Sequence, residues 1–149
     1  MKNIEIVRNK QRLDYLFDLI SQLTTNLELQ AQWARYLCIL VAGFIETSIR
    51  TIYLQYTKDK AAPNVANYVS SRLGQLRNPN MERILILAGS FDPKWREWIE
   101  KDAGDELKAS VDSIMALRHP IAHGVTYTRV RDYYTNIVKL IEIIENRCQ

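Results

Sequence analysis

Both histidines of this chain lie in one short segment, RHPIAH, which begins at Arg118 and ends at His123. Histidine is the side chain whose unperturbed pKa lies closest to neutrality, and arginine is a permanent cation suited to phosphate. A neutral imidazole can take a proton from a hydroxyl group, and an imidazolium can donate one to a leaving oxygen. A guanidinium beside them can stabilise the charge that develops on phosphate oxygens. Together these groups suffice to cleave RNA without a metal ion, with the ribose 2′-hydroxyl as nucleophile.

A proline inside the segment is expected to bring these groups together. On an unbroken helix, Arg118 and His123 would lie about 140° apart and would not share a face. Pro120 lacks an amide hydrogen and clashes with the preceding turn, so we expect the helix to kink or stop near His119. Gly124 then permits a left-handed exit from the helix. Arg118 and His123 can therefore meet at one edge of the helix end, with Pro120 as the residue that shapes the site.

Two other interpretations of the segment stay open. The histidines could merely cap a helix end or pack around it. A metal site is the second alternative, because His119 and His123 have the i, i+4 spacing of the helical histidine pair in HExxH sites. However, a proline follows His119 where those sites have glutamate, and the chain has no third histidine. A closed metal site needs more ligands than this pair offers, so we predict no metal and no cofactor.

Size and composition limit the classes of protein to which this chain can belong. A chain of 149 residues is long enough for one compact domain with a single core, so we expect residues 1–149 to form one domain. Hydrophobic residues make up 47% and charged residues 25%, as in ordinary soluble proteins. The net charge of +3 is compatible with nucleic-acid binding but does not demand it.

The ends of the chain and its cysteines indicate a cytoplasmic protein. Cys38 stands in an apolar run and Cys148 is the penultimate residue, which is typical of reduced thiols rather than a disulfide framework. The N-terminus is charged and lacks the apolar stretch of a signal peptide. The longest apolar run, residues 36–45, is about half of the ~20 residues that a membrane span needs. We therefore expect no membrane partner.

Helical periodicity dominates the chain and predicts an all-α fold, a bundle of two long N-terminal and two C-terminal helices with small helices between them. Asp92 and Pro93 form a helix start, and Gly104 ends that helix. Thr128 is the predicted cap of the last helix. The predicted helices span residues 4–26, 27–58, 65–76, 81–88, 94–101, 105–117 and 128–146.

The second predicted helix is apolar nearly all round between residues 36 and 45, which argues for a central, buried position. One stripe along it comprises Trp33, Leu37, Leu40, Val41, Phe44, Ser48 and Ile52. We expect the core to account for this stripe, and no exposed apolar stripe stands out as a surface for a partner.

Glu46 interrupts that apolar run, which is costly unless the carboxylate has a partner or a wet surface. A structural interpretation is an exposed i, i+4 pair with Arg50, which contributes about 0.3–0.5 kcal/mol. A functional interpretation is that Glu46 orients Arg118 or a histidine from the neighbouring helix. Both interpretations stay open at the level of sequence. We expect Tyr133 and Tyr134 to be core or dimer-face residues rather than base-stacking platforms, and we expect Trp95 and Trp98 to pack.

The RHPIAH segment resembles the Arg-x4-6-His motif of the HEPN superfamily. Four further blocks resemble the RiboL-PSP-HEPN branch of that superfamily: residues 43–50, 70–73, 90–97 and 129–134. The similarity covers roughly residues 33–145, most of the chain. By this resemblance Arg118 and His123 take the two motif positions, and His119 takes the variable polar position after the arginine.

The resemblance implies a four-helix core and a metal-independent endoribonuclease. It also implies a homodimer in which two motif-bearing helix ends form one composite cleft. Relatives serve as toxins, abortive-infection factors and other RNA-directed defence or stress proteins, some of them with an antitoxin or regulatory partner. The expected products are a 2′,3′-cyclic phosphate and a 5′-hydroxyl. The alternative is a non-catalytic dimeric helical module that binds RNA, a nucleotide or a partner protein.

Overall fold

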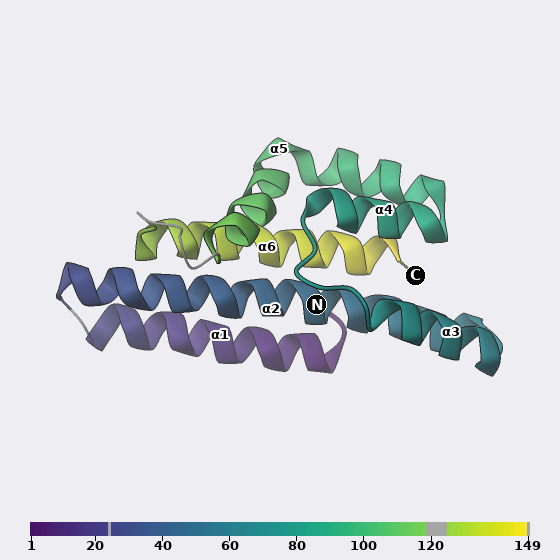
Figure 1. Cartoon of the computed structure of the whole chain (residues 1–149), viewed down its shortest axis with the longest axis horizontal. Coiled ribbons are helices and arrows are strands. Elements are labelled where there is room, and N and C mark those ends of the chain that lie inside the picture. Colours follow the sequence, from purple (N-terminus) through teal and green to yellow (C-terminus); the bar gives the residue numbers. More distant parts are fainter. Residues whose placement is uncertain (24, 119–124, 149) are drawn as a thin grey trace.

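The structure is a computed structural model of the chain and describes residues 1–23, 25–118 and 125–148. Within these ranges the chain forms six α-helices and no strands, which confirms the predicted all-α fold (Figure 1). The helices are α1 (Ile4–Leu23), α2 (Leu27–Lys60), α3 (Pro63–Leu73), α4 (Met81–Phe91), α5 (Pro93–Leu117) and α6 (Tyr127–Arg147). Four long helices form the bundle, and the two 11-residue helices α3 and α4 lie between the N-terminal and C-terminal pairs in sequence.

Side-chain caps fix where the helices begin. Asp92 accepts a hydrogen bond from an amide in the first turn of α5, which confirms the predicted helix start. The prediction that the first helix reaches Asn26 is wrong, because the Asn26 side chain accepts two amide hydrogen bonds, at 2.9 and 3.2 Å, from the first turn of α2. Similarly, Thr126 and not Thr128 caps α6, by accepting from the amide of Arg129 at 3.2 Å.

A sharp bend divides α5 at Gly104. Its backbone has φ 67° and ψ −178°, a conformation that only glycine adopts without strain. The bend confirms the predicted boundary between a helix that ends near residue 104 and another that begins at 105. As a result the second half of α5 runs in a different direction from the first and ends beside α2 and α6 (Figure 1).

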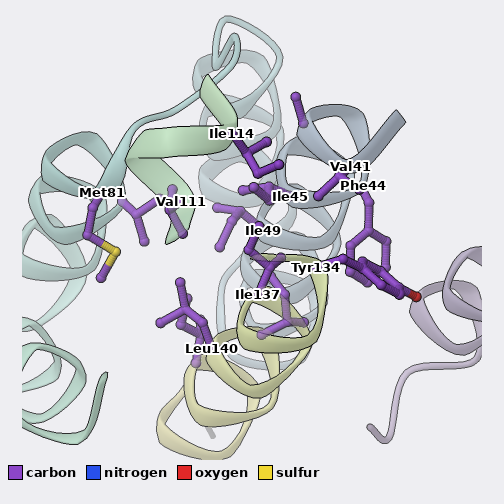
Figure 2. Packing of buried hydrophobic residues seen from close by; sticks show 14 of the residues in the cluster. Val41, Phe44, Ile45, Ile49, Met81, Val111, Ile114, Tyr134, Ile137 and Leu140 are labelled. Atoms are coloured by element: carbon purple, nitrogen blue, oxygen red, sulfur yellow. The ribbon is translucent and has the colours of Figure 1, made fainter. Parts of the chain in front are cut away.

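The long helix α2 is the centre of the bundle, as predicted, and packs against α1, α3, α5 and α6. Figure 2 shows part of the core, where side chains of α2 meet those of α5 and α6. The residues drawn there include Val41, Phe44, Ile45, Ile49, Val111, Ile114, Tyr134, Ile137 and Leu140. Every one of them is at most 5% exposed, so this contact fixes how the C-terminal end of α5 and the start of α6 sit on α2.

Among the described residues, α2 is the one helix that is long and apolar enough to cross a membrane by length and composition. However, 56% of its most apolar 18-residue window is buried inside the protein. Core helices of soluble proteins pass the same test, and the burial of α2 is consistent with a soluble domain.

Candidate functional site

Arg118 is the C-cap residue of α5 and lies on the protein surface. Its amide donates to the carbonyl oxygen of Ile114 at 3.1 Å, and its backbone keeps the right-handed helical conformation. The guanidinium is exposed and forms no ion pair with another described residue. A cation at a helix C-terminus is stabilised by the helix dipole, so the position suits arginine even before any ligand is considered. The charge nevertheless remains available to an anion from solution.

The other predicted residues of the motif lie outside the described residues. These are His119, Pro120 and His123, together with Gly124. Their meeting at one edge of the helix end therefore stays a prediction. The structure does place both flanks of the segment, since Arg118 caps the end of α5 and the chain is described again from Val125, which is 6% exposed.

The start of α6 is anchored to α1. The Tyr127 hydroxyl donates to the carbonyl oxygen of Phe17 at 2.7 Å, and the Tyr134 hydroxyl donates to the Asp14 carboxylate at 2.7 Å. The Phe17 ring stacks on the Tyr134 ring with centroids 4.8 Å apart. Burial, reinforced by the bond to Asp14, raises the pKa of Tyr134, so this hydroxyl stays protonated as the donor. These contacts hold the C-terminal flank of the segment in place.

The two helices that flank the segment are also joined directly. The Asn136 side-chain amide on α6 donates to the Ser110 hydroxyl on α5 at 2.9 Å. The Ser110 hydroxyl donates in turn to the carbonyl oxygen of Glu106 at 3.0 Å. With the core contacts between α5 and α6, this bond links the two helices on either side of the segment in sequence.

A pocket of about 350 Å³ lies next to Arg118, between the end of α5 and the N-terminal half of α2. Its lining combines two arginines, Arg35 and Arg118, with the Tyr36 ring and the apolar side chains of Ile39 and Leu117. Guanidinium groups bind phosphate and an aromatic ring can stack on a base, so the lining has the chemistry of a nucleic-acid contact. Arg35 and Tyr36 were missed from the sequence, because nothing in the chain near them indicated proximity to Arg118.

An exposed apolar face of α2 borders this pocket. Its members are Leu29, Trp33, Tyr36 and Ile39, which are 46%, 45%, 47% and 55% exposed, and we call them the α2 stripe. The spacing of three and four residues places them on one side of the helix. The expectation that the core covers Trp33 and leaves no exposed stripe is therefore wrong. The contacts of α2 with α5 and α6 instead bury its opposite face, which includes Val41 and Ile45.

Glu46 lies seven residues further along α2 than Ile39, and its described contacts are with the connection between α3 and α4. Its carboxylate accepts from the amide of Asn78 at 2.7 Å and pairs with Arg50 at 2.9 Å and Arg77 at 3.7 Å. The i, i+4 pair with Arg50 that the sequence allowed is thus present. It is more buried than expected, because the Glu46 side chain is only 16% exposed. That Glu46 orients Arg118 or a histidine stays a prediction.

Both cysteine thiols and the rings of Tyr134 and Trp95 lie in the interior of the protein. Burial raises the pKa of Cys38 to about 11 and that of Cys148 to about 11, so both thiols are protonated near neutral pH and neither is an activated nucleophile. Tyr134 and Trp95 are buried, which confirms that they pack in the core. Trp98 is 39% exposed and carries the Arg147 guanidinium 5.2 Å from its ring centroid.

The comparisons with known proteins agree with the helical frame. The family model described as RiboL-PSP-HEPN matches residues 6–149, nearly the whole chain. Neither the curated proteins nor the solved structures gave a match. A match of this length, over six helices that include both flanks of the RHPIAH segment, means that this chain belongs to the RiboL-PSP-HEPN family.

Proposed function

We propose that this protein is a metal-independent endoribonuclease whose active site is the RHPIAH segment between α5 and α6. One observation carries the proposal: Arg118 is an exposed guanidinium, unpaired within the described structure, at the end of a helix that packs on α2 and α6. It borders a pocket lined by a second arginine and a tyrosine, and both histidines of the chain follow it within five residues. The HEPN family includes ribonucleases, which gives this arrangement a chemical precedent.

The proposed reaction is an internal transfer at the phosphodiester. One histidine of the motif removes the proton from the 2′-hydroxyl, and the 2′-oxygen attacks the adjacent phosphorus. Arg118 stabilises the added negative charge on the phosphorane oxygens. The second histidine, from the other subunit, protonates the 5′-oxygen as the P–O bond breaks. The products are a 2′,3′-cyclic phosphate and a 5′-hydroxyl, and no cofactor takes part.

We further propose that a second copy of the chain completes the site. The α2 stripe supports this proposal because its large apolar side chains are half exposed and directly border the Arg118 pocket, which Tyr36 and Ile39 also line. Contiguous apolar surface of this kind typically marks a contact with another protein. A symmetric contact through the stripe would bring the two Arg118 pockets close to each other.

For the biological setting we propose a cytoplasmic protein that acts on RNA in toxin, phage-defence or stress responses, with an antitoxin or regulatory partner. The family membership supports this setting, together with a net charge of +3 that favours contact with an RNA backbone.

The proposal is tested by incubating the purified protein with RNA of mixed sequence in excess EDTA and identifying the product ends by mass spectrometry. We expect cleavage to persist in EDTA and to leave 2′,3′-cyclic phosphates. The rate should show a bell-shaped pH dependence, because one imidazole must be neutral and the other protonated. RNA binding without cleavage would instead favour the non-catalytic module.

A further inference from the structure

A second pocket is lined by residues of α3, of α4 and of the connection between them, and Arg118 is not part of its lining. In Figure 1 both helices lie to the right of the C-terminal end of α5. Its volume is about 570 Å³. This falls within the range of about 300–1,000 Å³ that is typical of small-molecule sites. α3 packs on α2 and α4 packs on α5, so each wall of the pocket belongs to a helix that another element supports.

Much of the pocket lining is apolar, and we call this part the apolar wall. Its side chains come from one face of α3, from the connection after α3, and from one face of α4. They are Val69, Leu73, Leu76, Leu87 and Phe91. Leu73 is buried and the other four are half-buried, so the wall is continuous with the core and yet open on one side. Such a wall suits a flat apolar group of the ligand.

Two arginines supply all the charge of the described lining. Arg72 projects from α3 and Arg83 from α4, and no acidic side chain lines the pocket. Neither guanidinium forms an ion pair with a described residue. By contrast, the nearby Arg50 and Arg96 pair with Glu46 and Glu82 at 2.9 and 3.0 Å. Two uncompensated guanidinium groups at one pocket favour a phosphate, because each can donate two parallel hydrogen bonds.

Polar groups at the rim add hydrogen-bonding capacity. Tyr68 is 66% exposed and offers a ring for stacking, and Gln75 offers an amide that both donates and accepts. The Ser90 hydroxyl donates to the carbonyl oxygen of Ile86 at 2.7 Å, so its lone pairs remain for a donor on the ligand. These groups match the polar edge of a heterocyclic base.

The connection that closes the pocket is held in place by α2. The Arg50 guanidinium donates to the carbonyl oxygen of Leu73 at 3.0 Å and also to that of Leu76. Glu46 pairs with Arg50 and accepts from the amide of Asn78, a residue with a left-handed φ of 42°. Glu46 and Arg50 therefore act as positioning residues that preform one wall of the pocket. A preformed site avoids the cost of ordering a loop when the ligand binds.

We propose that the α3–α4 pocket binds a nucleoside monophosphate, with the base against the apolar wall and the phosphate at Arg72 and Arg83. The nucleotide is either free or the 5′-phosphorylated end of an RNA strand, since both present the same group. Arg118, the described residue of the RHPIAH segment, does not line this pocket, and occupancy of the pocket does not depend on cleavage at that segment.

Calorimetric titration of the full chain with 5′-AMP tests the proposal, with adenosine and inorganic phosphate as partial ligands. We expect saturable binding of 5′-AMP and roughly tenfold or greater weakening in Arg72→Ala/Arg83→Ala, from the loss of charge-assisted hydrogen bonds. Adenosine and phosphate should each bind more weakly than 5′-AMP. Arg8→Ala is the matched control, because Arg8 is an exposed α1 arginine, unpaired with described residues and absent from the pocket lining.

A four-nucleotide RNA with a 5′-phosphate, added to the Arg118→Ala variant, separates the two sources of the ligand. Tighter binding than 5′-AMP, lost in Arg72→Ala/Arg83→Ala, assigns the pocket to a strand end, and weaker binding assigns it to the free nucleotide. The proposal is overturned if neither probe binds saturably, or if the Arg72→Ala/Arg83→Ala and Arg8→Ala variants bind 5′-AMP alike. Circular dichroism melting of each variant establishes that the chain is folded.

Discussion

At the scale of single residues, Arg118 and Glu46 have opposite surroundings. Arg118 is exposed at the end of α5 without a described ion pair, whereas the Glu46 carboxylate is enclosed by Arg50, Arg77 and the amide of Asn78. An uncompensated charge at the surface is available for a ligand, whereas removing one partner of an ion pair with low exposure leaves the other charge unpaired and lowers stability. We therefore infer that the role of the Glu46 carboxylate is to stabilise the connection between α3 and α4.

This assignment predicts that Glu46→Gln lowers the free energy of unfolding by about 1–2 kcal/mol, because a charge-assisted hydrogen bond and an ion pair are weakened. Urea unfolding checks the loss, with Glu97→Gln as the control at an exposed glutamate that has no described partner. The rate of RNA cleavage by the folded variant should stay near that of the wild type. A large fall in that rate with unchanged stability would instead support the role of orienting Arg118.

At the scale of elements, the bend in α5 sets where the helix ends. Gly104 has a positive φ, and after it the helix turns so that its last residues pack beside α2 and α6 (Figure 1). A helix continued straight from Pro93 could not place Arg118 beside Arg35 and Tyr36. The bend is therefore part of how the predicted site is built.

We predict that Gly104→Ala lowers the free energy of unfolding by about 1–3 kcal/mol, since alanine at this φ and ψ is strained. Gly43→Ala is the matched comparison. Gly43 lies within α2, and a methyl group there would meet nothing within 4 Å. The Gly43→Ala substitution should raise the free energy of unfolding by about 0.5–1 kcal/mol, because alanine is a better helix former than glycine. Equal effects of the two changes in urea unfolding would contradict the strain at Gly104.

The helix boundaries and the exposed face of α2 show how much of the fold could be predicted from the sequence. The Asp92–Pro93 start and the Gly104 boundary were predictable, because each depends on the local chemistry of one or two residues. The role of Asn26 was not, since asparagine is compatible with both a helix end and the cap of the next helix. The exposure of Trp33 was missed for a different reason. Periodicity gives the apolar side of a helix, but only tertiary packing decides how much of it is covered.

At the scale of the whole molecule, the α2 stripe and the Arg118 pocket form one continuous surface. Ile39 belongs to both, and it also lines a neighbouring groove of about 340 Å³ between α1 and α2. The proposed homodimer would bury this surface. The resemblance to HEPN proteins predicted a dimer, but the sequence could not say which face forms it.

We predict that Ile39→Asp weakens the dimer roughly a hundredfold, because a carboxylate would be buried without a partner. Analytical ultracentrifugation over a range of concentrations measures the effect. Ile86→Asp is the matched control, since Ile86 on α4 is 52% exposed and Ile39 is 55% exposed. A wild-type protein that stays monomeric, or equal dimerisation of the two variants, would exclude the α2 stripe as the dimer face.

The most direct measurement of the central claim is the rate at which wild-type protein and the Arg118→Ala/His123→Ala variant cleave mixed RNA in EDTA. We predict that the wild type cleaves and that the variant is slower by about 10²–10⁴-fold, the range expected for loss of general acid–base catalysis. Arg8→Ala, at an exposed arginine on α1, should cleave at the wild-type rate. A folded double variant that cleaves RNA as fast as the wild type would contradict the assignment of the active site to the RHPIAH segment.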